Sequence, residues 1–302
     1  MSSFRPELEA KCALVEAFLQ KQFTGSPHYQ VLLEAMRYSL LAGGKRLRPV
    51  LVMSFAEAVG GTAEAVLPAA AAIEMIHTYS LIHDDLPCMD NDDYRRGRLT
   101  CHKVYGEDIA TLAGDALQSA AFHTLSSTQA DPARVLRCVE ILSGAAGENG
   151  MVAGQILDLE GEKRPYTEEE LREVHRHKTG DLIRAACQMG AVLGGGTPEQ
   201  VEAAGEYAMA LGLAFQIRDD MLDEIGDQKA LGKPVGSDSA NGKSTFVTIH
   251  GLEACQRLVE QETVRAEQAL RQGGFQKTAF LEALSEWLVS RDHGEKIWFY
   301  SA

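Results

Sequence analysis

The sequence has few cysteines and no paired-cysteine motif, which excludes two common ways of stabilising a small fold. None of its six cysteines forms a CxxC pair with another; they are Cys12, Cys88, Cys101, Cys138, Cys187 and Cys255. A disulfide framework or a zinc site built on paired cysteines is therefore not indicated. No signal peptide precedes these residues, so we expect reduced thiols in a cytoplasmic protein.

Basic residues and long apolar runs are also scarce. The chain carries 29 basic and 43 acidic residues, a net charge of −14, which argues against general nucleic-acid binding because that depends on basic patches. No apolar run approaches the roughly 20 residues that span a bilayer. The balance of 45% apolar and 24% charged residues is ordinary for a globular protein, so we predict a soluble protein without a membrane span.

Strand signals are missing, whereas helical signals recur along the chain. Ser26-Pro27 is typical of a helix start and Gly43-Gly44 of a helix end. Apolar residues recur between them at helical spacing; they are Leu32, Leu33, Met36 and Leu40. Thr167 to Glu170 and Thr197 to Gln200 both match the capping-box pattern.

No shift in composition, proline-rich linker or internal repeat divides the chain. Residues 69–85 are rich in alanine, leucine and isoleucine and have the character of a buried helix. A chain of 302 residues can form one large domain or two ordinary ones. We predict a single all-α domain over residues 1–302, a bundle of about ten or more helices.

Two aspartate-rich blocks are the main chemical feature of the sequence. The first contains Asp84, Asp85 and Asp90, and the second contains Asp219, Asp220 and Asp223. A buried carboxylate is costly unless a cation neutralises it. Ligands that are all oxygen favour a hard ion such as Mg²⁺, which usually binds through a few carboxylates and a substrate phosphate. The blocks therefore predict a magnesium site that also holds phosphate.

The spacing within the blocks supports this interpretation. Asp219 and Asp223 lie four residues apart, so both carboxylates share one helix face, and Gln216 lies on that face too. An acidic, solvent-exposed face is the alternative, but apolar residues surround these acids. Asp90 follows Pro87, which should end or bend the helix, so Asp90 must reach back toward Asp84. His77 and His83 have either a structural or a functional role.

Candidate phosphate-binding residues lie close to both blocks. Residues 43–49 read Gly-Gly-Lys-Arg-Leu-Arg-Pro, residues 95–97 read Arg-Arg-Gly, and residues 178–180 read Lys-Thr-Gly. Arginine binds phosphate through two parallel hydrogen bonds, and lysine supplies a mobile charge. Lys233 and Lys243 lie in a glycine- and serine-rich stretch, residues 232–245, which is either a mobile lid or a solvated linker.

Together these motifs resemble one enzyme family in kind and in order. The set comprises Gly-Gly-Lys-Arg-Leu-Arg-Pro, His-Asp-Asp-x₄-Asp, Arg-Arg-Gly, Lys-Thr-Gly, Gly-x-x-Phe-Gln-Ile-x-Asp-Asp-x-x-Asp and Gly-Lys-x-x-Gly-x-Asp, between about residues 28 and 250. It is similar to the short-chain trans-polyprenyl diphosphate synthases, and most similar to the bacterial farnesyl diphosphate synthases. The resemblance implies an isoprenoid synthase-type bundle around a deep central cavity and a homodimer.

The resemblance also gives the motif residues their expected roles. Three Mg²⁺ ions would be held by Asp84, Asp85, Asp90, Asp219, Asp220 and Asp223, which with Lys178 and Gln216 form the expected catalytic set. The diphosphate of an allylic substrate, dimethylallyl or geranyl diphosphate, would be bound by Arg95, Lys178, Thr179, Gln216, Lys233 and Lys243. Isopentenyl diphosphate would be bound by Gly44, Lys45, Arg48, His77 and Arg96.

In this family the residues four and five before the first aspartate line the cavity that receives the growing chain. Here these residues are Ser80 and Tyr79. The bulky Tyr79 and the inserted Pro87-Cys88 favour a product of fifteen carbons, and ordinary core packing is the other interpretation of Tyr79. Residues 74–78 and 88–93 also resemble geranylgeranyl diphosphate synthases, which make a C20 product. Two features depart from the family pattern, Tyr94 and the C-terminal residues 294–302.

Three other functions are weighed against the same residues. A class I terpene cyclase would share the fold but normally has a mixed second metal motif and needs no site for isopentenyl diphosphate. A His-Asp phosphohydrolase would need further histidine ligands and leaves the second aspartate block unexplained. A non-catalytic partner subunit should have lost some of the six acids, and all six are present.

Overall fold

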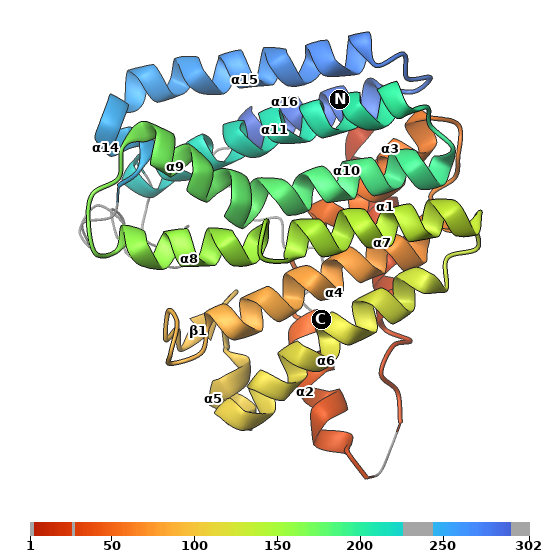
Figure 1. Cartoon of the computed structure of the whole chain (residues 1–302), viewed down its shortest axis with the longest axis vertical. Helices are drawn as coiled ribbons and strands as arrows, with labels where there is room; N and C mark the ends of the chain where they lie inside the picture. Colours follow the sequence, from red (N-terminus) through yellow and green to blue (C-terminus); the bar gives the residue numbers. More distant parts are fainter. Residues whose placement is uncertain (1–2, 26–27, 226–243, 291–302) are drawn as a thin grey trace.

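The computed structural model describes residues 3–25, 28–225 and 244–290, and this part of the chain is almost entirely helical (Figure 1). The longer helices are α1 (Phe4–Leu19), α2 (Gln30–Leu40), α3 (Leu47–Ala58), α4 (Leu67–Asp84), α6 (Glu107–Ser126), α7 (Pro132–Ala146), α8 (Met151–Gly161), α9 (Glu168–His175), α10 (Asp181–Gly194), α11 (Pro198–Ile225), α15 (Leu252–Gln272) and α16 (Ala279–Ser290). Shorter elements are η1 (Glu64–Val66), α5 (Cys101–Tyr105), α14 (Phe246–His250) and η2 (Arg176–Gly180), which is one turn of π-helix. The predicted all-α class is confirmed.

The helices pack side by side in a bundle (Figure 1). α10 contacts α3, α7 and α11, while α15 covers α11 and α6 covers α4. One cluster of buried apolar side chains runs through this bundle from Phe4 to Leu288. Its centre includes α4, in which Ala69 to Ile73 are fully buried. A helix that is apolar on all sides is one that is buried on all sides, so α4 forms the middle of the core.

α4 is also long and apolar enough to cross a membrane, since residues Glu64–Asp84 have a mean hydropathy of 1.4. Length and composition alone are weak evidence for a membrane span, and 72% of the 18-residue apolar window in this stretch is buried inside the protein. This burial agrees with the buried helix predicted over residues 69–85.

Two of the predicted helix starts agree with the structure and one does not. Thr167 and Glu170 form the predicted capping box at the start of α9. Thr197 and Gln200 bond reciprocally at the start of α11. In contrast, α2 begins at Gln30, so the predicted start at Ser26-Pro27, which itself lies outside the described residues, was about three positions early.

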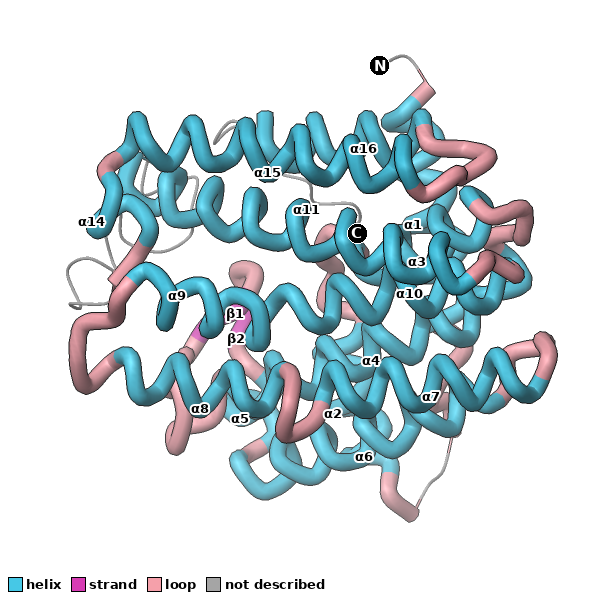
Figure 2. Tube along the Cα trace, turned by 45° about the horizontal axis from the view of Figure 1, so that its top comes forward, coloured by secondary structure: helices cyan, strands magenta, loops and turns pink. Residues whose placement is uncertain are grey.

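The acidic loop after α4 contains the strands that the sequence did not predict. β1 (Tyr94–Arg95) pairs antiparallel with β2 (Arg98–Leu99), and Figure 2 shows this hairpin as the small non-helical element of the described bundle. Arg96 and Gly97 form the turn, both with positive φ (52° and 75°). Glycine adopts that conformation readily, so the Arg-Arg-Gly sequence suits a tight turn. The turn directs Arg95 and Arg96 back toward α4.

Candidate active site

The first aspartate block lies where α4 ends. Asp84 and Asp85 are buried, with 8% and 3% of their surface exposed, whereas Asp90 is exposed. The helix stops before Pro87, and the backbone N–H of Asp90 donates a 2.9 Å hydrogen bond to the carbonyl of Asp84. The chain therefore turns back on itself as predicted, and Asp90 returns to the end of α4.

Each buried carboxylate of this block has a cationic or amide partner. Arg95 donates to Asp85 through Nε at 2.8 Å and lies 2.6 Å from it through Nη2. Burial raises the pKa of Asp85, and the hydrogen bonds from Arg95 oppose that rise. Asp84 accepts a 2.7 Å hydrogen bond from Gln155 Nε2 and lies 4.0 Å from Lys178 Nζ. Both acids are thus held by groups that also bind phosphate.

Lys178 lies on the π-helix η2, next to Thr179, and reaches toward α8. Its Nζ lies 2.7 Å from Asp158 Oδ2. The two segments can approach because residue 154 is glycine, where a Cβ atom would lie 2.2 Å from the backbone nitrogen of Lys178. π-helical turns occur often at functional sites, and this one places the ammonium beside the first aspartate block.

Gln155 and Asp158 belong to the site, although the sequence analysis did not identify them. They lie three residues apart on α8, so they share a helix face. The sequence signal that could have identified them is the presence of two polar residues at that spacing within the largely apolar stretch Met151–Gly161.

The second aspartate block lies near the end of α11. Asp223 is buried, with 6% of its surface exposed, and Asp219 and Asp220 are half-buried. Asp220 accepts a 2.8 Å hydrogen bond from the backbone N–H of Phe246 at the start of α14. One turn earlier on α11, Gln216 interacts with the ring of His175. The acids lie on a helix as predicted, with Asp223 buried and the other two half-buried. That this edge faces a metal ion stays a prediction.

The cationic loop between α2 and α3 is tightly built against the β1–β2 hairpin. Gly43 and Gly44 have φ values of 78° and 127°, and Arg96 Nη1 donates to the Gly43 carbonyl. Side chains other than glycine rarely adopt the φ of Gly44, and a Cβ atom there would lie 2.7 Å from the Arg96 guanidinium, which would have to move. Lys45 extends from the same loop to within 5.1 Å of the centre of the Phe215 ring on α11.

Arg48, His77 and Arg96 form a cationic cluster beside this loop. Burial lowers the pKa of Arg48 to about 10; Glu74 opposes this and the charge of Arg96 adds to it. Burial, then Arg48 and Arg96, lower the pKa of His77 well below 6.5, so His77 is neutral at pH 7. The Nε of Arg48 is buried and has no hydrogen-bond partner among the described residues. A cluster of this kind is suited to bind an anion.

Arg46 in the same motif has a different role. Its side chain is 1% exposed and lies 2.6 Å from Glu16 and 2.7 Å from Glu74. It also donates to the Leu40 carbonyl at 2.7 Å. The charge of Arg46 is therefore neutralised inside the protein by Glu16 and Glu74.

Tyr79 and Ser80 lie one turn before the first aspartate block. Tyr79 is buried between α4 and α6, with 6% of its surface exposed, and packs edge-on against His83 at 5.7 Å. Burial raises the pKa of Tyr79, and Gln118 of α6 opposes this. Ser80 Oγ donates to the His77 carbonyl at 2.8 Å. These contacts fix the tyrosine ring in place.

The carboxylate donors fit Mg²⁺, although they do not form a complete cage by themselves. Within residues 3–25, 28–225 and 244–290, no three His, Cys, Asp or Glu side chains lie close enough to share one ion. Mg²⁺ commonly completes its coordination with waters and substrate phosphates, so these oxygen donors suit a metal that arrives with a diphosphate. Lys233, Lys243 and the C-terminal residues 294–302 lie outside the described residues.

The structure shows an all-α bundle with two aspartate blocks and several basic residues on its helices and loops, and comparison with known proteins identifies its family. Residues 29–285 match the model of the polyprenyl synthetase family. The chain belongs to this family, and its structural neighbours share its isoprenoid synthase fold.

Relatives of two product classes are equally similar. A farnesyl diphosphate synthase of Geobacillus stearothermophilus is 48% identical over 87% of this chain and 89% of its own. The large subunit 1 of a heterodimeric geranylgeranyl pyrophosphate synthase of Arabidopsis thaliana is also 48% identical, over 86% of this chain and 72% of its own. A solved FPP/GFPP synthase of Zymomonas mobilis, 35% identical, covers 96% of this chain and all of its own with a TM-score of 0.87.

Proposed function

We propose that the protein is a Mg²⁺-dependent farnesyl diphosphate synthase, which joins isopentenyl diphosphate head-to-tail (1′-4) to dimethylallyl or geranyl diphosphate. The observation that carries this proposal is the cationic cluster of Arg48 and Arg96 beside neutral His77, with Lys45 reaching α11. This cluster would supply a second anion site in addition to the one at the aspartate blocks. An enzyme that condenses two diphosphates needs two such sites, whereas a terpene cyclase needs one.

The aspartate side of the site is suited to the allylic substrate. Mg²⁺ bound by Asp84, Asp85, Asp90, Asp219, Asp220 and Asp223, three ions in all, would neutralise the charge that develops on the departing diphosphate. Arg95 and Lys178 lie next to the first of these blocks. They would bind the same diphosphate together with Thr179, Gln216, Lys233 and Lys243.

The cationic cluster would hold isopentenyl diphosphate. Gly44 leaves room beside the Arg96 guanidinium, and Lys45, Arg48 and Arg96 would bind the phosphates while His77 donates as a neutral ring. The allylic carbon–oxygen bond breaks, and the double bond of isopentenyl diphosphate forms the new carbon–carbon bond. A proton then passes from the carbon chain to the departing pyrophosphate, and the loss of this proton restores a double bond. No nucleophilic side chain takes part.

The product is farnesyl diphosphate because Tyr79, together with Ser80, would close the cavity that receives the chain. This proposal is supported by the packing of Tyr79 between α4 and α6, where only 6% of the residue's surface is exposed. A geranylgeranyl diphosphate synthase is the second candidate, since synthases of both products are 48% identical to the chain.

The two-site arrangement predicts a selective kinetic effect at Arg48. Arg48→Gln should raise the KM for isopentenyl diphosphate at least tenfold and change the KM for geranyl diphosphate little. Arg137→Gln, on the exposed face of α7, is the matched control and should change neither. Equal effects on both KM values would contradict a separate isopentenyl site.

We also propose a single-domain, cytoplasmic homodimer. The continuous core from Phe4 to Leu288 and the six free thiols support the first two statements. Large apolar side chains exposed on adjoining helices support the dimer; they are Leu112 on α6, Leu136 on α7 and Ile156 on α8, each at least 55% exposed. Sedimentation equilibrium should give twice the chain mass of 32.8 kDa, and a monomer would contradict the dimer.

A further inference from the structure

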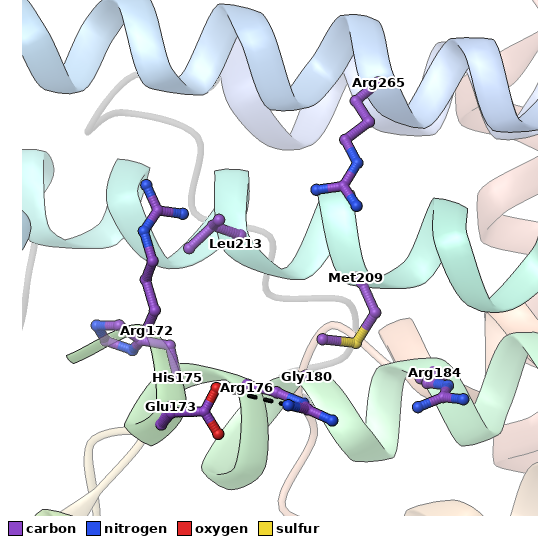
Figure 3. A pocket seen from close by; sticks show the side chains of 9 residues that line it. All are labelled: Arg172, Glu173, His175, Arg176, Gly180, Arg184, Met209, Leu213 and Arg265. Atoms are coloured by element: carbon purple, nitrogen blue, oxygen red, sulfur yellow. Dashed lines mark hydrogen bonds and ion pairs between the residues drawn. The ribbon is translucent and has the colours of Figure 1, made fainter. Parts of the chain in front are cut away.

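A cavity rich in arginine lies beside η2, and none of the six aspartates lines it (Figure 3). Its volume is about 340 Å³. It is lined by Arg172, Glu173, His175, Arg176, Gly180, Arg184, Met209, Leu213 and Arg265, which we call the arginine cavity. These residues come from the consecutive elements α9, η2 and α10 and from α11 and α15, so a continuous stretch and two further helices form its walls.

The position of the cavity follows from the geometry of η2. Arg176 and Gly180 line the cavity, whereas Lys178, midway between them, points to Asp158 on α8. The same π-helical turn therefore has Lys178 on one side and the cavity on the other. No residue of the two proposed substrate positions lines the arginine cavity, although His175 in its wall interacts with Gln216 of the allylic position.

The charge of this cavity contrasts with that of the whole protein. Four arginines and a single carboxylate, Glu173, line it, while the chain carries a net charge of −14. Repulsion among four cations disfavours such a grouping unless an anion binds between them.

The arginines are only partly neutralised by their neighbours. Arg172 is well paired, at 2.7 Å from Glu168. Arg176 and Arg265 each approach an acid at 3.5 Å, Glu173 and Glu262 respectively. Exposed ion pairs of that length contribute little to stability, so the arginines can leave these acids and bind a ligand instead.

Arg184 has an exposed side chain. Its charge acts on Asp181, one turn earlier on α10, where it opposes the rise in the pKa of Asp181 that burial causes. Figure 3 shows Arg265 reaching into the cavity from α15 and Arg184 on the facing wall, on α10, with Met209 between them. Guanidinium groups on facing walls can each give a bidentate contact to a phosphate that lies between them.

We propose that the arginine cavity binds a phosphate-bearing anion of about diphosphate size. Met209 and Leu213 give it an apolar wall, so an apolar group attached to the phosphate can also be accommodated. Two sources share this chemistry, inorganic pyrophosphate and a prenyl diphosphate. The proposal stands on the cavity and does not depend on the transferase activity.

Calorimetric titration of the full chain tests this proposal. Inorganic pyrophosphate is added to the protein in EDTA, so that metal-assisted binding at the aspartate blocks is removed. We expect one class of sites to weaken at least tenfold in the double variant Arg184→Gln/Arg265→Gln. Both side chains are exposed, and circular dichroism checks that the variant folds.

Arg257→Gln is the matched control, because Arg257 lies on α15, outside the cavity, and pairs with Glu253 at 2.7 Å. This control should keep the wild-type isotherm. An unchanged isotherm in the double variant overturns the proposal, as does an equal loss in the control, which would indicate general electrostatics. Repeating the titration with farnesyl diphosphate assigns the source: tighter binding that depends on the two arginines identifies a prenyl ligand, and weaker binding identifies pyrophosphate.

Discussion

The Lys178 ammonium lies 2.7 Å from Asp158 Oδ2 and 4.0 Å from Asp84 Oδ2. Asp158 thus holds the lysine next to the first aspartate block, and no carboxylate of that block is needed for this contact. A substrate diphosphate placed beside Asp84 would meet a cation that is already oriented, which reduces the entropy lost on binding.

This contact predicts a positioning role for Asp158. Asp158→Asn weakens the hold on Lys178, so we expect the KM for geranyl diphosphate to rise several-fold and the KM for isopentenyl diphosphate to stay within twofold. Steady-state kinetics with each substrate varied in turn measures this. Glu140→Gln, at an exposed position on α7, is the control, and a parallel change in both KM values would indicate a purely structural role.

Arg46 should matter for stability more than for substrate binding. Arg46→Met leaves Glu74, which is 4% exposed, buried without its partner. Removing one member of a buried ion pair costs about 3 to 5 kcal/mol of unfolding free energy. Urea denaturation measures the loss. The double variant Arg46→Met/Glu74→Gln should recover part of it, and a single variant as stable as the wild type would contradict this account.

His175 should make the protein less stable in acid. Burial lowers the pKa of His175 to about 4, and Gln216 opposes the shift. The unfolded chain binds this proton near pH 6.5 and the folded chain does not, so stability falls as pH decreases from about 6.5 to about 4. The difference between the urea midpoints at pH 7 and at pH 5 should be smaller in His175→Gln than in the wild-type protein. His123→Gln, an exposed position, should keep the wild-type difference.

Tyr79 should limit the length of the product. Tyr79→Met and Tyr79→Ala open space between α4 and α6, so the products should extend beyond fifteen carbons. Chromatography of the dephosphorylated products measures the distribution. Gln118→Leu is an informative companion, because it changes the neighbour of the Tyr79 hydroxyl and leaves the ring in place. If neither Tyr79 variant lengthens the product, the tyrosine is a core residue only.

Local sequence patterns predicted the helices and the motif residues, but contacts between distant segments could not be predicted in the same way. Asp84 and Asp223 are buried on helices as expected, and Asp85 is buried directly after the end of α4, because their apolar neighbours lie at helical spacing. Gln155 and Asp158 were missed because their importance depends on how α8 packs against η2. That packing depends on the glycine at 154, and nothing local in the sequence shows which segment fills the space.

The hairpin and Arg46 illustrate the same limit. Two-residue strands are too short to give an alternating pattern, so only the Arg-Arg-Gly turn signalled β1 and β2. Arg46 looks like Lys45 and Arg48 in sequence, yet Glu16 and Glu74, from 30 and 28 residues away, neutralise it. Charge in a motif therefore indicates a binding loop, and tertiary contacts decide which cations are available.

The most direct test of the central claim is product analysis with purified protein, Mg²⁺, isopentenyl diphosphate and geranyl diphosphate. We expect farnesyl diphosphate and an equal amount of pyrophosphate, with no product when either substrate or Mg²⁺ is left out. A C20 diphosphate as the main product would favour the geranylgeranyl alternative. No condensation product, or a hydrocarbon formed without isopentenyl diphosphate, would contradict the account.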